Sequence, residues 1–271
     1  MLNTNRGVLI MKKEMYKLML ELTNNPVYSR LLKGFVSTKL SKPFVSSFAK
    51  VYGVNLGELA REVTDYPTLG EFFTRELKAG VRALPENENE IVSPVDGVLT
   101  ESGKIGEDLS FHVKGKAYSL KTMLGIQSAI NRYEHGDYFV FYLSPKDYHR
   151  IHSPFSGKVV KRWALGKYSE PVNEMGKFYG KEPLASNYRL ITELTHQDKR
   201  MAMVKVGALN VNSIHPTHVG KTLDRGEEVA YFSFGSSIVL LFEPDTIVIN
   251  EEVKQVDVVI EHGQSIGRWK E

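Results

Sequence analysis

The chain has 271 residues and no cysteine, which excludes a disulfide framework, a cysteine nucleophile and a thiolate metal site. No apolar run approaches the roughly 20 residues that a helix needs to span a bilayer, so we expect a protein that does not cross a membrane. The net charge of +3 is unevenly spread, because residues 1–50 carry nine Lys or Arg and only two acids. A basic front end on an acidic body favours an anionic partner, either nucleic acid or lipid.

The first fifty residues contain amphipathic helical patterns. Residues 13–22 place Met15, Leu18, Met19 and Leu22 at helical spacing, with lysines on the opposite side, and Asn24-Asn25-Pro26 ends this predicted helix. A second apolar set follows at Phe44, Val45, Phe48, Val51 and Tyr52. Basic amphipathic helices with exposed aromatic residues and leucines suit the headgroup region of a bilayer. Packing against the rest of the protein is the alternative, and the sequence leaves both open.

After Tyr66-Pro67 the pattern changes to β-type. A short helix around 69–77 is followed by runs rich in Val, Ile, Phe and Tyr that turn residues separate: 91–99, 138–143, 158–163, 201–206, 229–234, 237–242, 246–249 and 253–260. These runs predict an α+β fold, with a mostly antiparallel β core behind a basic helical region. We expect a helical membrane-association region at 1–66 and a catalytic β-rich domain at 67–271.

Two short segments of this β-rich part resemble each other. Ser93-Pro-Val-Asp96-Gly97 is echoed sixty positions later by Ser153-Pro-Phe-Ser-Gly157, and both predict a tight turn that leads into a strand. The pair therefore indicates a structural repeat. Asp-Gly is common in turns, so a turn residue is the simplest interpretation of Asp96 and a chemical role is the alternative.

A pair of histidines follows in Tyr148-His149-Arg150-Ile151-His152. On a strand, positions 149 and 152 face opposite sides, which suits two different roles better than one shared metal. A catalytic base, a metal pair and ordinary surface polarity all fit the pattern. A second pair with the same spacing, His215 and His218, keeps the metal interpretation open.

The third candidate is Phe234-Gly235-Ser236-Ser237, which interrupts an otherwise continuous apolar run. A turn or bulge is the simple interpretation, although a glycine within a strand often marks a close backbone approach. Asp96, His152 and Ser236 together supply the residue types of a nucleophilic triad. The Gly-x-Ser-x-Gly elbow of the α/β-hydrolases is absent from this sequence.

Four ordered motifs resemble those of the phosphatidylserine decarboxylase family, in its pyruvoyl-dependent, prokaryotic type. They are Phe72-Phe73-Thr74-Arg75-Glu-Leu-Lys78-Ala-Gly80-Val-Arg82, Ser93-Pro-Val-Asp96-Gly97, Tyr148-His149-Arg-Ile-His152-Ser-Pro154 and Phe234-Gly235-Ser236-Ser237. The last motif is most often written Leu-Gly-Ser-Thr in the family, so Phe234 and Ser237 are departures beside the reacting residue.

The resemblance implies a proenzyme that cuts itself between Gly235 and Ser236. Ser236 would attack the Gly235 carbonyl with His152 as its base and Asp96 orienting that base. The products would be a large chain 1–235 and a small chain 236–271 that remain associated. Ser236 would become a pyruvoyl group, so the implied cofactor is pyruvoyl, with no metal and no pyridoxal phosphate.

The resemblance also implies roles in the reaction itself. The pyruvoyl group at Ser236 would form a Schiff base with the amine of phosphatidylserine, and His149 would serve decarboxylation. Arg75, Lys78 and Arg82 are candidate contacts of the lipid phosphate, with a solvated helix face as the alternative. We expect a homodimer, peripheral on the cytoplasmic face of the cell membrane, that acts on phosphatidylserine in an anionic bilayer and not on nucleic acid.

Other classes of protein also fit parts of the pattern. A serine hydrolase or esterase would use Asp96, His152 and Ser236 as a triad and would keep an intact chain. A binding module would explain the basic front end but not the triad residues. A pyruvoyl decarboxylase of a soluble amino acid would not need the basic amphipathic start.

Overall fold

The computed structural model describes residues 26–168, 172, 182–208 and 213–271. Its first elements form a helical front (residues 26–73) with a small core of its own. The elements are α2 (Pro26–Val36), η1 (Lys39–Phe44), α3 (Val45–Tyr52), η2 (Leu56–Glu58), η3 (Val63–Asp65) and α4 (Leu69–Phe73). The helix predicted at 13–22 lies outside the described residues. No helix within these ranges is both long and apolar enough to cross a membrane.

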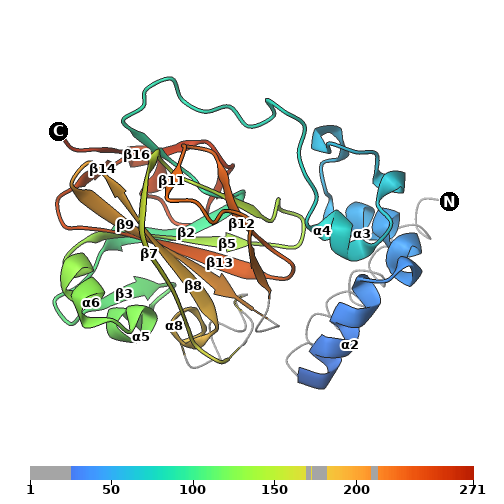
Figure 1. The fold of residues 1–271 in the computed structure, drawn as a ribbon, viewed down its shortest axis with the longest axis horizontal. Helices are drawn as coiled ribbons and strands as arrows, with labels where there is room; N and C mark the ends of the chain where they lie inside the picture. Colours follow the sequence, from blue (N-terminus) through green and yellow to red (C-terminus); the bar gives the residue numbers. More distant parts are fainter. Residues whose placement is uncertain (1–25, 169–171, 173–181, 209–212) are drawn as a thin grey trace.

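An antiparallel sheet of eight strands forms the centre of the molecule (Figure 1). Its order is β11 (Thr222–Leu223), β7 (Gly157–Leu165), β8 (Arg189–His196), β9 (Lys199–Gly207), β13 (Ser236–Phe242), β5 (Asp137–Leu143), β2 (Gly97–Lys104) and β15 (Val258–Ile260). Every neighbouring pair is antiparallel. The predicted α+β architecture is thus confirmed, while the boundary predicted at residue 66 stays a prediction.

Two hydrophobic clusters cover the two faces of this sheet. One face packs against two three-stranded sheets: β1 (Glu90–Val92), β16 (Ser265–Trp269) and β14 (Ile247–Ile249), and β10 (Ile214–Pro216), β12 (Glu228–Phe232) and β6 (Arg150–His152). The other face is covered by the hairpin β3 (Ser110–Val113) and β4 (Lys116–Ser119) and by α5 (Leu120–Leu124), α6 (Gln127–Tyr133) and α8 (Pro183–Ser186). All seven residues of β13 are buried, because it pairs on both sides and packs on both faces.

Three of the predicted elements differ from those in the structure, and one strand was not predicted. The helix predicted at 69–77 ends at Phe73. The run predicted at 91–99 is divided between β1 and β2. The strand predicted at 253–260 is only β15 (Val258–Ile260), preceded by the short η4 (Glu251–Val253). Strand β8 had no counterpart among the predicted runs, because Arg189, Thr192 and Glu193 interrupt its apolar pattern although all three are buried.

The two echoed segments form a structural repeat, as predicted. The hydroxyl of Ser93 donates to the carbonyl of Val95 (2.7 Å), and the hydroxyl of Ser153 donates to that of Phe155 (2.8 Å). The repeats also pair with each other, since the N–H of Val92 donates to the carbonyl of Pro154 and that of His152 donates to the carbonyl of Pro94, both at 2.9 Å. This back-to-back contact places Asp96 and His152 in one region.

Candidate functional site

Ser236 begins β13 and its side chain is fully buried. It lies opposite Leu143 of β5 and Gly207 of β9, so strands hold it on both sides. Within the described part of the chain, the hydroxyls of Ser236 and Ser237 have no hydrogen-bond partner. A buried hydroxyl without a partner costs about 1–3 kcal/mol. The fold therefore keeps an unengaged nucleophilic oxygen where β13 starts.

Residues 233–235 connect β12 to β13 and interrupt the apolar run, as the sequence predicts. We call them the cleavage turn, because the family resemblance predicts the cut directly after them. The N–H of Ser233 donates to the carbonyl of Ser213 (2.9 Å), and the hydroxyl of Ser233 contacts Nε2 of His215 (3.0 Å). Phe234 is buried. The turn is thus anchored by polar contacts immediately before Gly235 and Ser236.

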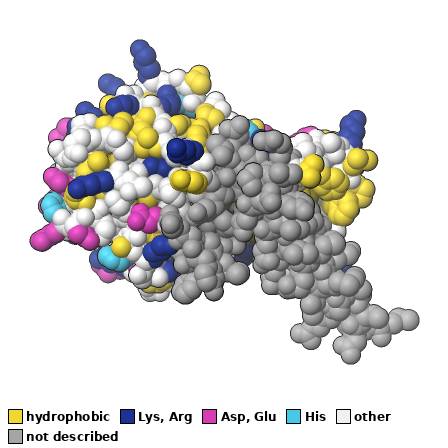
Figure 2. Space-filling model, turned by 90° about the horizontal axis from the view of Figure 1, so that it is seen from below, with side chains coloured by type: hydrophobic (Ala, Val, Ile, Leu, Met, Phe, Trp, Pro, Cys, Tyr) yellow, Lys and Arg dark blue, Asp and Glu magenta, His cyan; other side chains and the backbone are white. Residues whose placement is uncertain are grey.

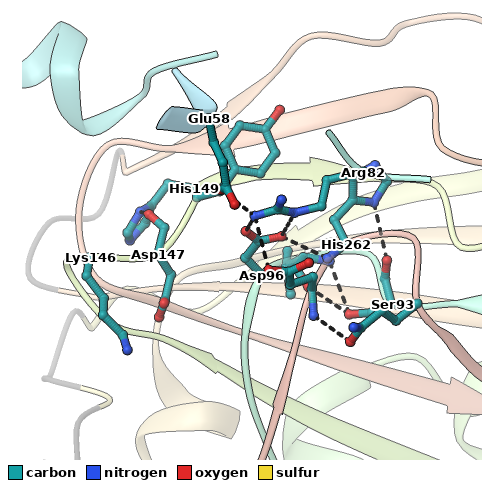
Figure 3. Close-up of polar contacts among 12 residues, drawn as sticks. Glu58, Arg82, Ser93, Asp96, Lys146, Asp147, His149 and His262 are labelled. Atoms are coloured by element: carbon teal, nitrogen blue, oxygen red, sulfur yellow. Dashed lines mark hydrogen bonds and ion pairs between the residues drawn. The ribbon is translucent and has the colours of Figure 1, made fainter. Parts of the chain in front are cut away.

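Asp96 is held by an arginine and a backbone amide, as Figure 3 shows. Arg82 donates from Nε to Oδ1 (3.1 Å) and from Nη2 to Oδ2 (2.5 Å), while the N–H of His262 donates to Oδ1 (2.8 Å). Arg82 also pairs with Glu58 of η2 at 2.9 Å. Burial lowers the pKa of Arg82, but its hydrogen bonds to the two carboxylates outweigh burial and raise the pKa overall.

His152 does not contact the carboxylate of Asp96 directly. Its Nδ1 lies 2.8 Å from the carbonyl of Gly226 and its Nε2 lies 3.1 Å from the hydroxyl of Tyr148. A carbonyl can only accept, so Nδ1 carries the proton and Nε2 accepts from Tyr148. The ring stacks on that of His262, with 3.8 Å between centroids and 15° between planes. Burial lowers the pKa of His152, so the ring is neutral near pH 7.

His149 is fully buried and has one unengaged nitrogen. Its Nδ1 donates to the carbonyl of Asp147 (2.7 Å), and its Nε2 has no partner among the residues the structure describes. Its ring lies 3.9 Å from that of Phe73 in α4. Burial, together with the charge of Arg75, lowers the pKa of His149 to about 3. Nε2 is therefore an unprotonated acceptor.

The two histidines lie at opposite ends of the β6–β12 pair. The carbonyl of His149 accepts from the N–H of Phe232, the residue just before the cleavage turn. His152 lies opposite Glu228, at the other end of β12. At about 3.3 Å per strand residue, roughly 10 Å of backbone separates them. The structure thus brings His149 to the cleavage turn and His152 to the region of Asp96.

The three predicted phosphate contacts occupy different positions. Arg75 is buried and donates from Nη2 to the carbonyls of Lys146 (2.5 Å) and Asp147 (2.8 Å), while its Nη1 has no partner in the described ranges. Lys78 is exposed and donates to the carbonyl of Gly57 (2.8 Å). Arg75, Arg82 and Asp96 line a cavity of about 200 Å³, which Lys78 does not reach.

The histidine pair considered for a metal does not converge. His215 contacts Ser233 and stacks on Tyr231, whereas His218 contacts Nη2 of Arg162 at 2.9 Å. No group of three or more metal-binding side chains occurs within the described ranges.

Sequence reasoning missed two residues of the site, His262 and Glu58. His262 follows an apolar run in Glu261-His262-Gly263, which has only the pattern of a turn, and Glu58 lies in the helical front. The N–H of His262 binds Asp96 directly, whereas Glu58 is linked to Asp96 through Arg82. The repeated Ser-Pro turn sequence at Ser93 and Ser153 was the local pattern that indicated a special structure in this region.

Comparison with known proteins gives a consistent result. Residues 69–268 match the family model described as phosphatidylserine decarboxylase. A phosphatidylserine decarboxylase proenzyme of Geobacillus kaustophilus is 48% identical over 261 residues, covering 96% of this chain and 98% of that protein. Proteins of the same name from a Geobacillus species and from Bacillus cereus are 46% and 49% identical, covering 96% and 90% of this chain and 100% and 93% of their own lengths.

Proposed function

The chain belongs to the phosphatidylserine decarboxylase family, and we propose that Ser236 is the residue at which it matures. It decarboxylates phosphatidylserine to phosphatidylethanolamine and CO2, and it is made as a proenzyme. The relatives give no support to a serine hydrolase that keeps an intact chain.

The unengaged hydroxyl of Ser236 carries this proposal. Its Oγ attacks the carbonyl carbon of Gly235, and the amide becomes an ester as the nitrogen takes a proton. β-Elimination then breaks the ester, leaving a carboxylate on Gly235 and a dehydroalanine at 236. Addition of water and loss of ammonia turn that residue into a pyruvoyl group. Ser236 fits this group because it is buried and nothing in the described structure binds its oxygen.

The base for this attack is a histidine, and two candidates have different support. His152, near Asp96, is the base that the sequence resemblance implies, but both its ring nitrogens are engaged in the uncut chain. His149 lies beside the cleavage turn with an unprotonated Nε2 that has no partner in the described ranges. We propose His152 with Asp96 for maturation, and we retain His149 as a second candidate on this observation.

After maturation, the pyruvoyl group supplies an electron sink for loss of CO2. The buried Nε2 of His149, unprotonated in the uncut chain, would take up a proton and then return it to the substrate carbon. Arg75, with Nη1 unpartnered in the described chain, is the best placed of the three predicted phosphate contacts, since Arg82 is already paired with Asp96 and Glu58.

We also propose that the protein sits on the cytoplasmic face of the membrane as a peripheral homodimer. The helical front exposes Leu31, Leu40, Phe44 and Leu56 together with Lys39, Lys42 and Lys50. Figure 2 shows hydrophobic side chains gathered at this end of the molecule with basic ones beside them. Apolar groups and cations on one surface suit an anionic bilayer. The front's own core shows that its other side chains pack inward.

An intact mass of active protein tests the maturation proposal. We expect two chains, one that ends at Gly235 and one that begins at position 236. The mass of the second should correspond to a pyruvoyl group in place of the serine. Activity from a sample that contains only the full-length chain would contradict it.

A further inference from the structure

The structural repeat extends from the two turns to the loops that face them. Ser93 donates from its N–H to the carbonyl of Gln264, and Ser153 donates in the same way to Glu227, both at 2.8 Å. In return, the N–H of Gly263 donates to the carbonyl of Ser93, and that of Gly226 donates to the carbonyl of Ser153. Residues 262–264 therefore contact the first turn through the same backbone hydrogen bonds that residues 225–227 make with the second turn.

Asp96 and Ser156 occupy equivalent positions in the two halves. Oγ of Ser156 accepts from the N–H of Arg225 (3.0 Å), and Oδ1 of Asp96 accepts from the N–H of His262 (2.8 Å). In both halves the fourth residue of the turn motif therefore fixes the backbone of the facing loop. The two loops differ in their side chains.

The guanidinium of Arg225 donates hydrogen bonds to backbone carbonyls. It donates to Pro85 and Asn87, both at 2.6 Å, and ties the segment before β1 to the core. The imidazole of His262 is directed instead onto the ring of His152, at 3.8 Å. The loop residue of the second half, Arg225, thus has a purely structural contact. The equivalent residue of the first half, His262, places its imidazole against the predicted base His152.

We propose that His262 is a positioning residue for His152, and that Asp96 acts on His152 through His262 rather than by a direct hydrogen bond. This rests on the proposed function, in which His152 assists self-cleavage. The hydrogen bonds to Gly226 and Tyr148 fix the His152 ring within its plane, and the stack on His262 fixes the plane itself. His262 is held in turn by Asp96 and by a 3.4 Å contact of its Nδ1 with the carbonyl of Ser93.

Burial keeps both rings of the stack neutral near pH 7. Burial is the main cause that lowers the pKa of His262 to about 3, and a charge on His152 would lower it further. Arg82 acts on His262, while Asp96, Glu228 and Arg150 act on His152. These opposite charges largely offset each other, so the two imidazoles stack without repulsion near pH 7.

His262 lies after the cleavage point and belongs to the small chain. The predicted base would come from the large chain and its supporting ring from the small one. The hydrogen bond from His262 to Asp96 would then join the two chains at the site, so we expect the arrangement to survive the cut.

The test compares His262→Phe, which keeps an aromatic ring, with His262→Ala, which removes it. Cleavage is followed on gels after cell-free synthesis. His262→Ala should slow cleavage by about 10- to 100-fold, the cost of a misplaced catalytic group, whereas His262→Phe should stay within about 3-fold of wild type. The control His196→Ala removes a half-buried ring that stacks on Trp269, away from the site, and should cleave normally.

A second measurement separates positioning from folding. In a Ser236→Ala background that stays uncut, NMR of the histidine rings should show the pKa of His152 rising toward its ordinary value in His262→Ala, because water reaches the ring, and staying low in His262→Phe. Normal cleavage with an unchanged His152 titration in His262→Ala overturns the proposal, as does a folded His262→Phe protein that cleaves as slowly as His262→Ala. Normal maturation of His152→Ala would instead overturn the assignment of His152 as the base. The pKa of His152 in the His262 variants would still show whether His262 positions its ring.

Discussion

Two neighbouring serines are both buried but point to opposite faces of the sheet, and they have different expected roles. Ser236 and Ser237 both begin β13, both are buried, and neither hydroxyl has a partner in the described chain. Only Ser236 follows Gly235. We expect Ser236→Ala to remain a single chain without activity, and the matched control Ser237→Ala to be cut and active. Intact masses of both proteins check this, and a two-chain Ser236→Ala product would show that the cut lies elsewhere.

Substitution of His149 and of His152 should affect different steps, the first the decarboxylation and the second the self-cleavage. We expect His152→Ala to block the cut, and His149→Ala to be cut yet decarboxylate at least about 100-fold more slowly, within the range for loss of a proton-transfer group. The measurement is cleavage on gels, followed by product formation from phosphatidylserine. An uncut His149→Ala with a normally cut His152→Ala would make His149 the base, in line with its unengaged Nε2.

Burial of neutral histidines should make stability depend on pH. Burial lowers the pKa of His149, His152 and His262 below the ordinary 6.5. The unfolded chain therefore binds protons first, so the free energy of unfolding is full above pH 6.5 and falls as the pH drops below it. Each histidine contributes up to about 1.4 kcal/mol per pH unit. Urea unfolding of the uncut Ser236→Ala protein between about pH 7.5 and 5 measures this; a flat profile would contradict it.

At the scale of elements, the helical front is joined to the β core by a short ion-pair network. Glu58 of η2 and Asp96, just before β2, share the guanidinium of Arg82. Arg150 of β6 adds a second link, since it donates to the carbonyl of Thr74 (3.1 Å) and pairs with Glu76. The front is thus fixed to the site that it borders.

Removing Arg82 should cost far more than removing a surface cation. Arg82→Gln leaves two carboxylates facing each other, one of them buried, so we expect a loss of about 3 kcal/mol in the free energy of unfolding and slower maturation. Lys254→Gln, which breaks only the exposed pair with Glu251, should cost less than about 1 kcal/mol. Urea unfolding of the two variants in the uncut background compares them, and equal losses would refute a special role for Arg82.

At the scale of the whole molecule, the proposed cut would leave the sheet intact. The new end at residue 236 would lie at the start of β13, which pairs with β9 along its whole length and with β5 up to Leu241. β15 and β16 of the small chain pair with β2 and β1 of the large one. We therefore expect the two proposed chains to remain one folded unit until the central sheet itself unfolds.

Membrane binding should be partly electrostatic and carried by the first fifty residues. Replacing Lys12, Lys13, Lys17, Lys33 and Lys39 with glutamine should weaken binding to anionic vesicles without affecting the cut; the first three lie outside the described residues. Raising the salt to 1 M, where the screening length is about 3 Å, should weaken wild-type binding without abolishing it, because apolar contacts persist. Co-sedimentation measures both, with Lys254→Gln and Lys270→Gln as controls on the β-rich part. Equal binding of the five-lysine variant at low salt would contradict this.

The sequence by itself determined the α+β class, the interruption of the apolar run at Gly235-Ser236 and the repeat of the Ser-Pro turn, because each is a local pattern of side-chain alternation or turn chemistry. It could not determine that Asp96 binds Arg82 and the amide of His262 instead of the ring of His152, or that His262 stacks on that ring. The two contacts of His262 join residues 110 or more positions apart, which only the packing of the sheets brings together. Strand β8 was missed for a related reason: its buried Glu193 finds a partner in the hydroxyl of Tyr133, on a distant helix. A polar residue in a strand indicates exposure until the tertiary structure supplies the partner that allows its burial.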